Sequence, residues 1–132
     1  MSDEFPRPTR SLSGRVAIVS GAGAAADGIG NGRASAILLA EVGCNVVCTD
    51  IKQDLAQRTV EMIEKDGVGN AIAVAADATK EDDCKNATKV AVEKFGRLDI
   101  LVNVVGIGGA TGTATEVDME KWSVLSLVVS SP

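Results

Sequence analysis

The fold is decided by residues 16–30, which read VAIVSGAGAAADGIG. The run begins with apolar residues typical of a buried strand, continues through a glycine-rich turn, and ends where a helix opens. Glycines let the backbone approach a diphosphate, while the N–H groups and positive dipole end of a helix attract negative charge. The stretch therefore predicts a phosphate-binding turn with a dinucleotide as its ligand. Glycines also mark ordinary turns and helix caps, so a plain turn is the alternative.

A carboxylate stands where the ribose of such a ligand would bind. The next apolar strand, residues 45–49, ends at Asp50, about 20 residues after Gly30, as this kind of site expects. A carboxylate there accepts hydrogen bonds from ribose hydroxyls and repels a 2′-phosphate, which favours NAD over NADP. Lys52 and Arg33 argue the other way, because either could neutralise a phosphate if it pointed inward. We expect both to be solvated, as basic residues on helix faces and loops usually are.

The composition is that of one globular domain. With 132 residues and 45% hydrophobic side chains, the chain can build a single core. Its net charge of −5 argues against nucleic-acid binding, which needs a basic surface. The N-terminus holds acids and prolines where a signal peptide needs a basic and an apolar region, and no apolar run is long enough to span a bilayer. We therefore expect no membrane association and a cytoplasmic setting.

The cysteines do not form a metal-ligand pattern. Cys44, Cys48 and Cys84 lack the spacing of a metal site, and the chain has no histidine to complete one. Free cysteine is among the most buried residue types. We therefore expect three buried or half-buried thiols and no metal.

Strands and helices alternate along the rest of the chain. After a polar, proline-containing tail over residues 1–13, expected to be mobile, we predict strands at 16–19, 45–49, 71–76 and 98–105. Helices are predicted from Gly30 to about Val42, over 55–66, and from an N-cap at Thr79 to Phe95, each closed by a glycine. The continuous apolar run 71–76 is expected to be covered on both faces. This order predicts an α/β fold, a Rossmann-type doubly wound parallel sheet over residues 14–132.

Each predicted helix has an apolar face that we expect to point inward. These faces are Ile29, Ala34, Ile37, Leu38 and Leu39 in the first helix, Leu55, Met62 and Ile63 in the second, and Cys84, Ala87, Ala91 and Phe95 in the third.

With these residues in place, the chain resembles the short-chain dehydrogenase/reductase family over nearly all of its length, although only over the cofactor-binding half of that family. Four motifs carry the resemblance. The family's Thr-Gly-x-x-x-Gly-x-Gly loop is similar to Ser20-Gly21 through Gly28-Ile29-Gly30, and Asp50 matches the acidic end of its second strand. Asp77-Ala78-Thr79 resembles its adenine-contacting motif, and Asn103-Val104-Val105-Gly106 is similar to its Asn-Asn-Ala-Gly.

The resemblance implies a cofactor site and a cofactor. The site residues would be Gly21, Gly23, Gly28, Ile29, Gly30, Asp50, Ile51, Asp77, Ala78, Asn103 and Gly106. Asp77 and the Ala78 backbone would contact the adenine, and Asn103 would brace the central strands. The chain departs from the family in a longer stretch between Gly21 and Gly28, and in Val104 and Val105 where the family has Asn and Ala. The cofactor expected is NAD, with NADP less favoured.

The family's catalytic residues have no counterpart in this chain. The family uses a tyrosine with a lysine four residues later, and a serine on a neighbouring strand, but the chain contains neither tyrosine nor histidine. A last helix from Glu116 to about Val129 is followed at once by Ser130-Ser131-Pro132. We therefore expect an incomplete domain, with the sheet truncated after about four strands and no catalytic residues.

Two functions follow from this expectation. The chain is either the dinucleotide-binding portion of an NAD(P)-dependent oxidoreductase that transfers hydride to or from an alcohol or carbonyl, or a non-catalytic nucleotide-binding or interaction module. In the second case it would be a truncated isoform that pairs with itself or with a full-length family member through the exposed edge of its last strand. A fragment without an independent role is the third alternative.

Overall fold

Four strands and three helices alternate in the computed structural model, which describes residues 8–105 and 113–121. In chain order these are β1 (Val16–Ser20), α1 (Asn31–Glu41), β2 (Asn45–Asp50), α2 (Gln53–Asp66), β3 (Ala71–Ala75), α3 (Glu81–Phe95) and β4 (Ile100–Asn103). The strands form one parallel sheet in the order β3-β2-β1-β4. The predicted α/β fold, a Rossmann-type doubly wound parallel sheet, is confirmed.

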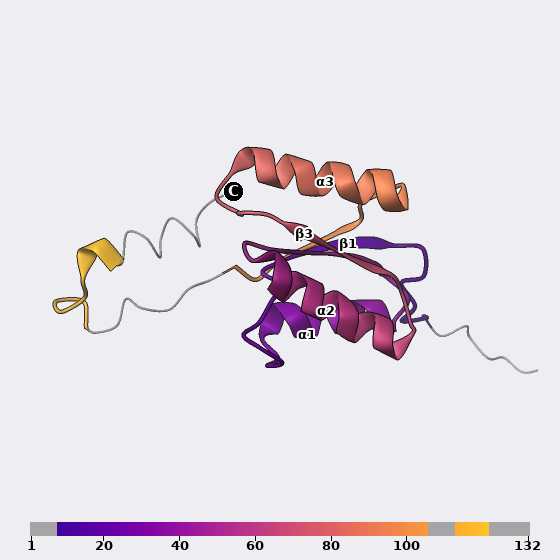
Figure 1. Cartoon of the computed structure of the whole chain (residues 1–132), viewed down its shortest axis with the longest axis horizontal. Coiled ribbons are helices and arrows are strands. Elements are labelled where there is room, and N and C mark those ends of the chain that lie inside the picture. Colours follow the sequence, from indigo (N-terminus) through magenta and orange to yellow (C-terminus); the bar gives the residue numbers. More distant parts are fainter. Residues whose placement is uncertain (1–7, 106–112, 122–132) are drawn as a thin grey trace, which may run out of the picture.

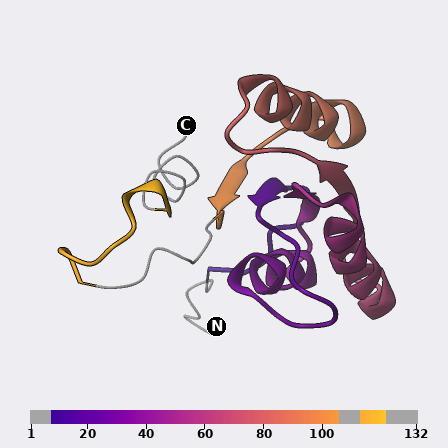
Figure 2. The same cartoon turned by 60° about the vertical axis from the view of Figure 1, so that its left-hand side comes forward.

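The sheet reverses its strand order at β1. β1 pairs with β2 on one side and with β4 on the other, and all five of its residues are buried. Figure 2 shows β4, in orange, beside β1 at one end of the sheet. The chain moves outward from β1 to β3 and then returns across the sheet to β4. In open parallel sheets, ligands bind where such a reversal separates the carboxyl ends of two strands.

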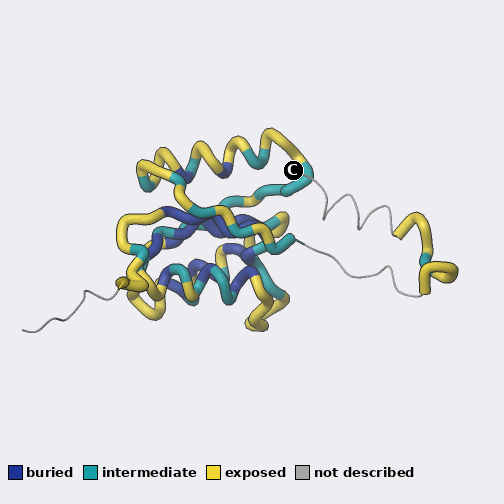
Figure 3. The backbone as a smooth tube through the Cα atoms, turned by 180° about the vertical axis from the view of Figure 1, so that it is seen from behind, coloured by how far each residue is buried: buried dark blue, intermediate teal, exposed yellow. Residues whose placement is uncertain are grey.

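Helices cover both faces of the sheet. α1 and α2 lie against one face and α3 lies against the other (Figure 1). The buried residues form a core in each layer, dark blue in Figure 3. The larger core lies between the sheet and the α1–α2 pair, and the smaller one packs Ala87 and Ala91 of α3 against Val16 and Ile18. Among the described residues, none of the helices is long and apolar enough to cross a bilayer.

The inward face of α1 differs from the prediction. Gly32, Arg33, Ala36 and Ala40 are its buried residues, whereas the side chain of Leu38 is 60% exposed. Small side chains at the contact let the helix backbone approach the sheet closely, so this face is set by residue size as well as by apolar character. Ile37 and Leu39 pack only partly against the core, and Ile29 and Leu38 were wrongly predicted to point inward.

The predicted faces of α2 and α3 are partly confirmed. In α2, Ile63 is buried as predicted, but Ala56, Thr59 and Val60 complete the buried face, while Leu55 and Met62 are only half-buried. In α3, Ala87 and Ala91 are buried, and Cys84 and Phe95 are half-buried. Gly67 and Gly96 are the C-caps of the two helices, as predicted.

Three further predictions about the strands and helices were incorrect. β3 is an edge strand in the described sheet and its central residues are half-buried, so it is not covered on both faces. β4 spans only 100–103 of the predicted 98–105. Lys80, and not Thr79, precedes α3 at the N-cap, because the Thr79 hydroxyl donates instead to Asp77. Residues 1–7 of the predicted tail, and the predicted last helix from Trp122 onward, lie outside the described residues.

Candidate functional site

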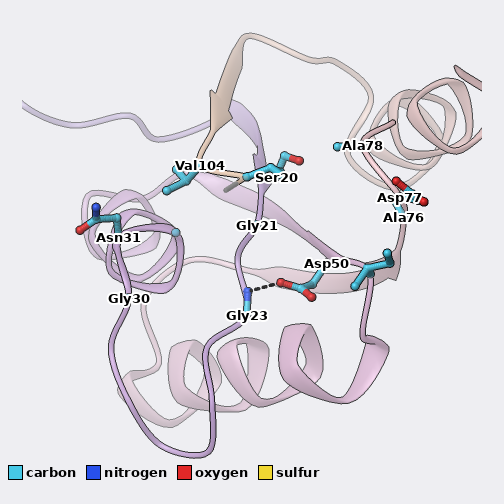
Figure 4. Close-up of a pocket in the computed structure, with 13 residues that line it drawn as sticks. Ser20, Gly21, Gly23, Gly30, Asn31, Asp50, Ala76, Asp77, Ala78 and Val104 are labelled. Carbon is cyan, nitrogen blue, oxygen red and sulfur yellow. Dashed lines mark hydrogen bonds between the residues drawn. The ribbon is translucent and has the colours of Figure 1, made fainter. Parts of the chain in front are cut away.

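A pocket of about 420 Å³ lies at the carboxyl ends of the strands, at the point where the strand order reverses (Figure 4). All four strand ends and the start of α1 contribute to it. Its lining residues are Ser20, Gly21, Gly23, Gly30, Asn31, Gly32, Asp50, Ile51, Ala76, Asp77, Ala78, Val104 and Val105. The topology therefore brings residues from positions 20 to 105 to one place.

Two glycines allow the chain to pass from β1 into α1 at this pocket. Gly21 has a φ of +78°, and a Cβ there would lie 2.8 Å from the Val104 carbonyl oxygen. A Cβ on Gly32 would lie 1.8 Å from the Gly21 carbonyl oxygen, which is far inside van der Waals contact. Only glycine fits at either position, because one needs left-handed backbone and the other needs close approach of helix and strand. The start of α1 is thereby pressed against the end of β1.

The N-terminus of α1 offers hydrogen-bond donors to this pocket. No side chain caps the helix at Gly30, and the amide of Ala34 makes the first bond back to the Gly30 carbonyl. The N–H groups of the first turn, at residues 31–33, precede that bond. Such groups, at the positive end of the helix dipole, are suited to bind an anion such as a diphosphate.

The inserted part of the glycine-rich turn does not line the pocket. Residues 24–30 form a loop that leaves the pocket after Gly23 and returns to it at Gly30, as Figure 4 shows. Gly28 and Ile29, both candidate cofactor-binding residues, lie in this loop and are not among the lining residues. The side chain of Ile29 is 61% exposed. Of the candidate residues in the glycine-rich turn, the structure therefore brings together Gly21, Gly23 and Gly30.

Arg33 is buried beneath this loop, contrary to the prediction that it is solvated. Its side chain is 0% exposed. The five donors of its guanidinium are matched by five bonds of 2.6–3.2 Å, which end on the Thr59 hydroxyl and on the carbonyl oxygens of residues 24, 26, 28 and 55. With every donor engaged, Arg33 has none left for a ligand phosphate. Lys52 is exposed, as predicted.

Asp50 links the end of β2 to the glycine-rich turn. Its Oδ2 accepts the Gly23 N–H at 3.1 Å, the dashed bond in Figure 4, and its Oδ1 accepts the Lys52 N–H at 3.0 Å. A carboxylate has about four acceptor positions, so each oxygen can accept a further bond from a ligand hydroxyl. Ile51, the next residue, places an exposed apolar side chain at the same end of the pocket.

Asp77 and Ala78 lie after β3 at the far end of the pocket from α1 (Figure 4). Asp77 Oδ1 accepts the Thr79 N–H and hydroxyl at 2.9 and 2.6 Å, and these bonds lower the pKa of the Asp77 carboxyl below its usual value. The Asp77 N–H donates to Asp83 of α3 at 2.8 Å. The carboxylate is therefore held in its ionised form and in a fixed orientation.

The end of β4 supplies the remaining wall. Val104 and Val105 line the pocket, and the Val104 N–H donates to the Ser20 carbonyl. Asn103 lies opposite Ser20 in the β1–β4 register and lines a smaller neighbouring cavity toward α3, not this pocket. Gly106, also a candidate residue, lies outside the described residues.

Six lining residues were not among the candidate site residues, namely Ser20, Asn31, Gly32, Ala76, Val104 and Val105. A signal for Gly32 was present, because Gly30-Asn31-Gly32 repeats the Gly-x-Gly spacing of residues 28–30 two positions later. Which pair lies beside the pocket, Gly28 and Gly30 or Gly30 and Gly32, depends only on where α1 begins. Nothing in the local sequence indicates the burial of Arg33, since its acceptors come from the loop and from α2.

The three cysteines are free thiols that are buried or half-buried. Cys44 and Cys48 are buried and Cys84 is half-buried, as predicted. Burial raises the pKa of the Cys48 thiol to about 12, which keeps it protonated and unreactive. Among the described residues, no group of three or more acidic, cysteine or histidine side chains is arranged to hold a metal ion.

Known proteins match both the sequence and this fold. A sequence model of the family described as Enoyl-(Acyl carrier protein) reductase matches residues 23–130. The chain is 35% identical over 114 residues to a cyclohexanol dehydrogenase of Acinetobacter, covering 86% of this chain and 43% of the relative. It is 41% identical over 98 residues to a 7alpha-hydroxysteroid dehydrogenase of Escherichia coli, covering 74% and 36%. The chain thus spans about two fifths of the length of these relatives.

Solved structures of related proteins have the same fold as this chain. A short chain dehydrogenase from Mycobacterium smegmatis superposes with a TM-score of 0.78 at 30% identity, covering 95% of this chain and 50% of that one. A hydroxysteroid dehydrogenase from Escherichia coli superposes with a TM-score of 0.70 at 34% identity, covering 92% and 53%. Sequence, strand order and pocket position lead to one conclusion: the chain belongs to the short-chain dehydrogenase/reductase family, whose members are oxidoreductases that use nicotinamide cofactors.

Proposed function

We propose that this chain is the dinucleotide-binding portion of an NAD(P)-dependent oxidoreductase that transfers hydride between the nicotinamide and an alcohol or carbonyl substrate. The observation that carries the proposal is one pocket that joins the uncapped N-terminus of α1 to the carboxylate of Asp50. The first feature suits a diphosphate and the second suits a ribose. When bound, the nicotinamide supplies the hydride chemistry, and the chain's own residues bind and orient the cofactor.

The adenosine half of the ligand fits the end of the pocket beyond Asp50. There the carboxylate oxygens of Asp50 would accept hydrogen bonds from the ribose hydroxyls, and the exposed side chain of Ile51 would pack on the adenine. Asp77 Oδ1 is occupied by Thr79, but Oδ2 has no partner among the described residues and can accept from the adenine amino group. The backbone of Ala78 lies beside it.

The diphosphate fits in the pocket in front of the α1 N-terminus, next to the end of β1. Gly21 and Gly32 allow the close approach of β1 and α1 that shapes this part of the pocket, and the first-turn amides at residues 31–33 point their donors along the helix axis. Val104 and Val105 then border the nicotinamide half. Gly28, Ile29 and Asn103, which the family resemblance implicated, would act at most indirectly, because they do not line the pocket.

We propose NAD over NADP as the cofactor. A 2′-phosphate would lie near the Asp50 carboxylate, which repels it. Arg33 cannot offset this repulsion, since all of its donors are engaged within the protein. Lys52 is exposed, and we expect its side chain to be solvated.

We assign no catalytic residue to this chain. It contains no tyrosine, the residue that the family uses as its acid/base group, and no histidine to substitute for it. Holding a dinucleotide without an acid/base group supplies binding and orientation only. The cytoplasmic setting and the oligomeric form expected from the sequence stay predictions.

A second candidate is the non-catalytic binding or interaction module. The observation that favours it is the position of β4, which is an edge strand of the described sheet with the side chain of Leu101 61% exposed. An apolar edge strand offers unpaired backbone groups to another chain. This module would bind the dinucleotide without turnover and pair through β4.

The site is tested by NMR titration of the isotope-labelled 132-residue chain with ADP-ribose and, separately, with adenosine. ADP-ribose should shift the amides of Gly21, Gly32 and Ala78, because it occupies both halves of the proposed site. Adenosine should shift Ala78 and leave Gly21 and Gly32 unchanged. Shifts confined to other surfaces, or none at millimolar ligand, would contradict the site.

A further inference from the structure

The loop over residues 24–30 is organised around one buried cation. Arg33 lies in the first turn of α1, directly after the pocket-lining Gly32, and its guanidinium points under the loop. One terminal nitrogen, Nη1, donates to the carbonyls of Ala26 and Gly28 at 2.9 and 2.6 Å. The other, Nη2, donates to the carbonyls of Ala24 and Leu55 at 3.1 and 3.2 Å. The loop and α2 are thereby tied to the start of α1.

The remaining donor reaches the glycine-rich turn through a relay. Arg33 Nε donates to the Thr59 hydroxyl at 2.9 Å, and that hydroxyl donates to the Ala22 carbonyl at 2.7 Å. Ala22 lies between Gly21 and Gly23, both of which line the pocket. Thr59 is fully buried, so water does not compete for these bonds. Arg33 therefore contacts the loop body directly and the start of the turn through one hydroxyl.

The charge of Arg33 is balanced by dipoles and not by an ion pair. Among the described residues no carboxylate lies within salt-bridge distance of its guanidinium, and its partners are four carbonyls and a hydroxyl. A planar fork with five donors matches this set of acceptors, whereas an ammonium with three donors does not. The geometry requires arginine specifically.

We propose that Arg33 is the positioning residue of the diphosphate site: by holding the 24–30 loop and Ala22, it fixes Gly21–Gly23 and the α1 N-terminus in the geometry that receives the diphosphate. It does not touch the ligand, since all of its donors are engaged within the protein. The inference rests on the proposed function, and it deepens it by assigning the shape of the phosphate site to a residue outside the pocket lining.

The chain offers a matched control for this role. Arg58 holds the same loop from outside, with Nε donating to the Asp27 carboxylate at 2.7 Å, but the two side chains are 43% and 73% exposed, so solvent competes for the bond. Arg33→Lys and Arg58→Lys are thus the same substitution on the two sides of one loop. Thr59→Val removes the relay hydroxyl at nearly constant volume, and Thr59→Ser retains it.

The test measures affinity for NAD, ADP and adenosine by calorimetry in the 132-residue chain and the four variants, with folding checked by circular dichroism. Arg33→Lys and Thr59→Val should each weaken NAD and ADP at least tenfold while adenosine stays within twofold. Arg58→Lys should stay within twofold for all three ligands, and Thr59→Ser should recover most of the affinity lost in Thr59→Val.

Several results would overturn the proposal. These are NAD and ADP affinities within twofold of the parent in Arg33→Lys, an equal loss for adenosine, or failure of both Arg33→Lys and Thr59→Val to fold, which would make Arg33 a support of the whole domain. Absence of NAD binding in the parent chain refutes the proposed function separately. In that case amide hydrogen exchange decides: faster exchange over 24–30 in Arg33→Lys than in Arg58→Lys supports the positioning role, and equal exchange overturns it.

Discussion

The Asp50 carboxylate accepts the backbone N–H of Gly23 at 3.1 Å, across 27 residues of sequence. This bond connects the end of β2 to the turn after β1, so the group that would bind the ribose also fixes the turn that would bind the diphosphate. A direct hydrogen bond therefore joins the two halves of the pocket. Substitutions at Asp50 should affect both.

Asp50→Ala should weaken NAD binding about 10- to 100-fold, because a hydrogen bond to a charged group contributes about 1.5–3 kcal/mol. It should relax discrimination against NADP, since the repulsion of the 2′-phosphate is lost. Calorimetric titration with both nucleotides gives the ratio. Asp54→Ala, at an exposed position at the start of α2, is the control and should leave both affinities unchanged. An unchanged NAD to NADP preference in Asp50→Ala would remove Asp50 from the cofactor site.

Gly32→Ala should destabilise the domain by about 1–3 kcal/mol, because the added methyl group would overlap the Gly21 carbonyl and push α1 from β1. Urea unfolding measures the change. Gly30→Ala is the comparison: its Cβ would meet no atom closer than 3.9 Å, so it should cost only about 0.5–1 kcal/mol for the poorer N-cap, less than Gly32→Ala. Equal stability of the two variants would mean that the close contact between helix and strand is not present in solution.

Asp99 should make the fold sensitive to acid. Its carboxylate accepts bonds from Arg97 and from the Val16 N–H that begins β1, and these lower its pKa to about 2. A folded-state pKa below the unfolded value means that the stabilisation is complete above pH 4 and is lost as the pH falls toward 2. The unfolding free energy of the parent should fall more steeply over this range than that of Asp99→Asn. Parallel curves for the two proteins would show that the Asp99 bonds do not contribute.

The edge position of β4 predicts self-association. The parent chain should sediment above monomer mass at tens of micromolar concentration, and Leu101→Lys should shift it toward monomer by placing a charge on the edge strand. Leu38→Lys is matched, because Leu38 is equally exposed but lies on α1, and should leave the mass distribution unchanged. A parent that is monomeric throughout, or equal effects of the two lysines, would contradict pairing through β4.

The sequence was sufficient to predict the order of elements, because each buried strand is a distinct apolar run and each later helix is closed by a glycine. It was also sufficient to place Asp50, Asp77 and Ala78 at strand ends, where a parallel sheet gathers its ligand-binding residues. These features depend on local pattern and on topology rules that hold across α/β folds.

What could not be predicted depends on contacts between segments. Leu38 is exposed because the face of α1 that packs on the sheet is made of small residues, Gly32, Ala36 and Ala40, which fit the sheet closely. Arg33 is buried because five acceptors from the loop and from α2 converge on it, and no pattern in the neighbouring sequence shows this. Whether Gly28 or Gly32 lines the pocket depends on where α1 begins, and α1 begins one residue later than predicted.

We propose that this pocket binds a nicotinamide dinucleotide and prefers NAD. Calorimetric titration of the 132-residue chain with NAD and then NADP tests this proposal, with molecular mass measured by light scattering on the same sample. Saturable binding of one NAD per chain, at least tenfold tighter than NADP, is the predicted result. A folded sample that binds neither nucleotide at millimolar concentration, or that prefers NADP, would contradict the claim.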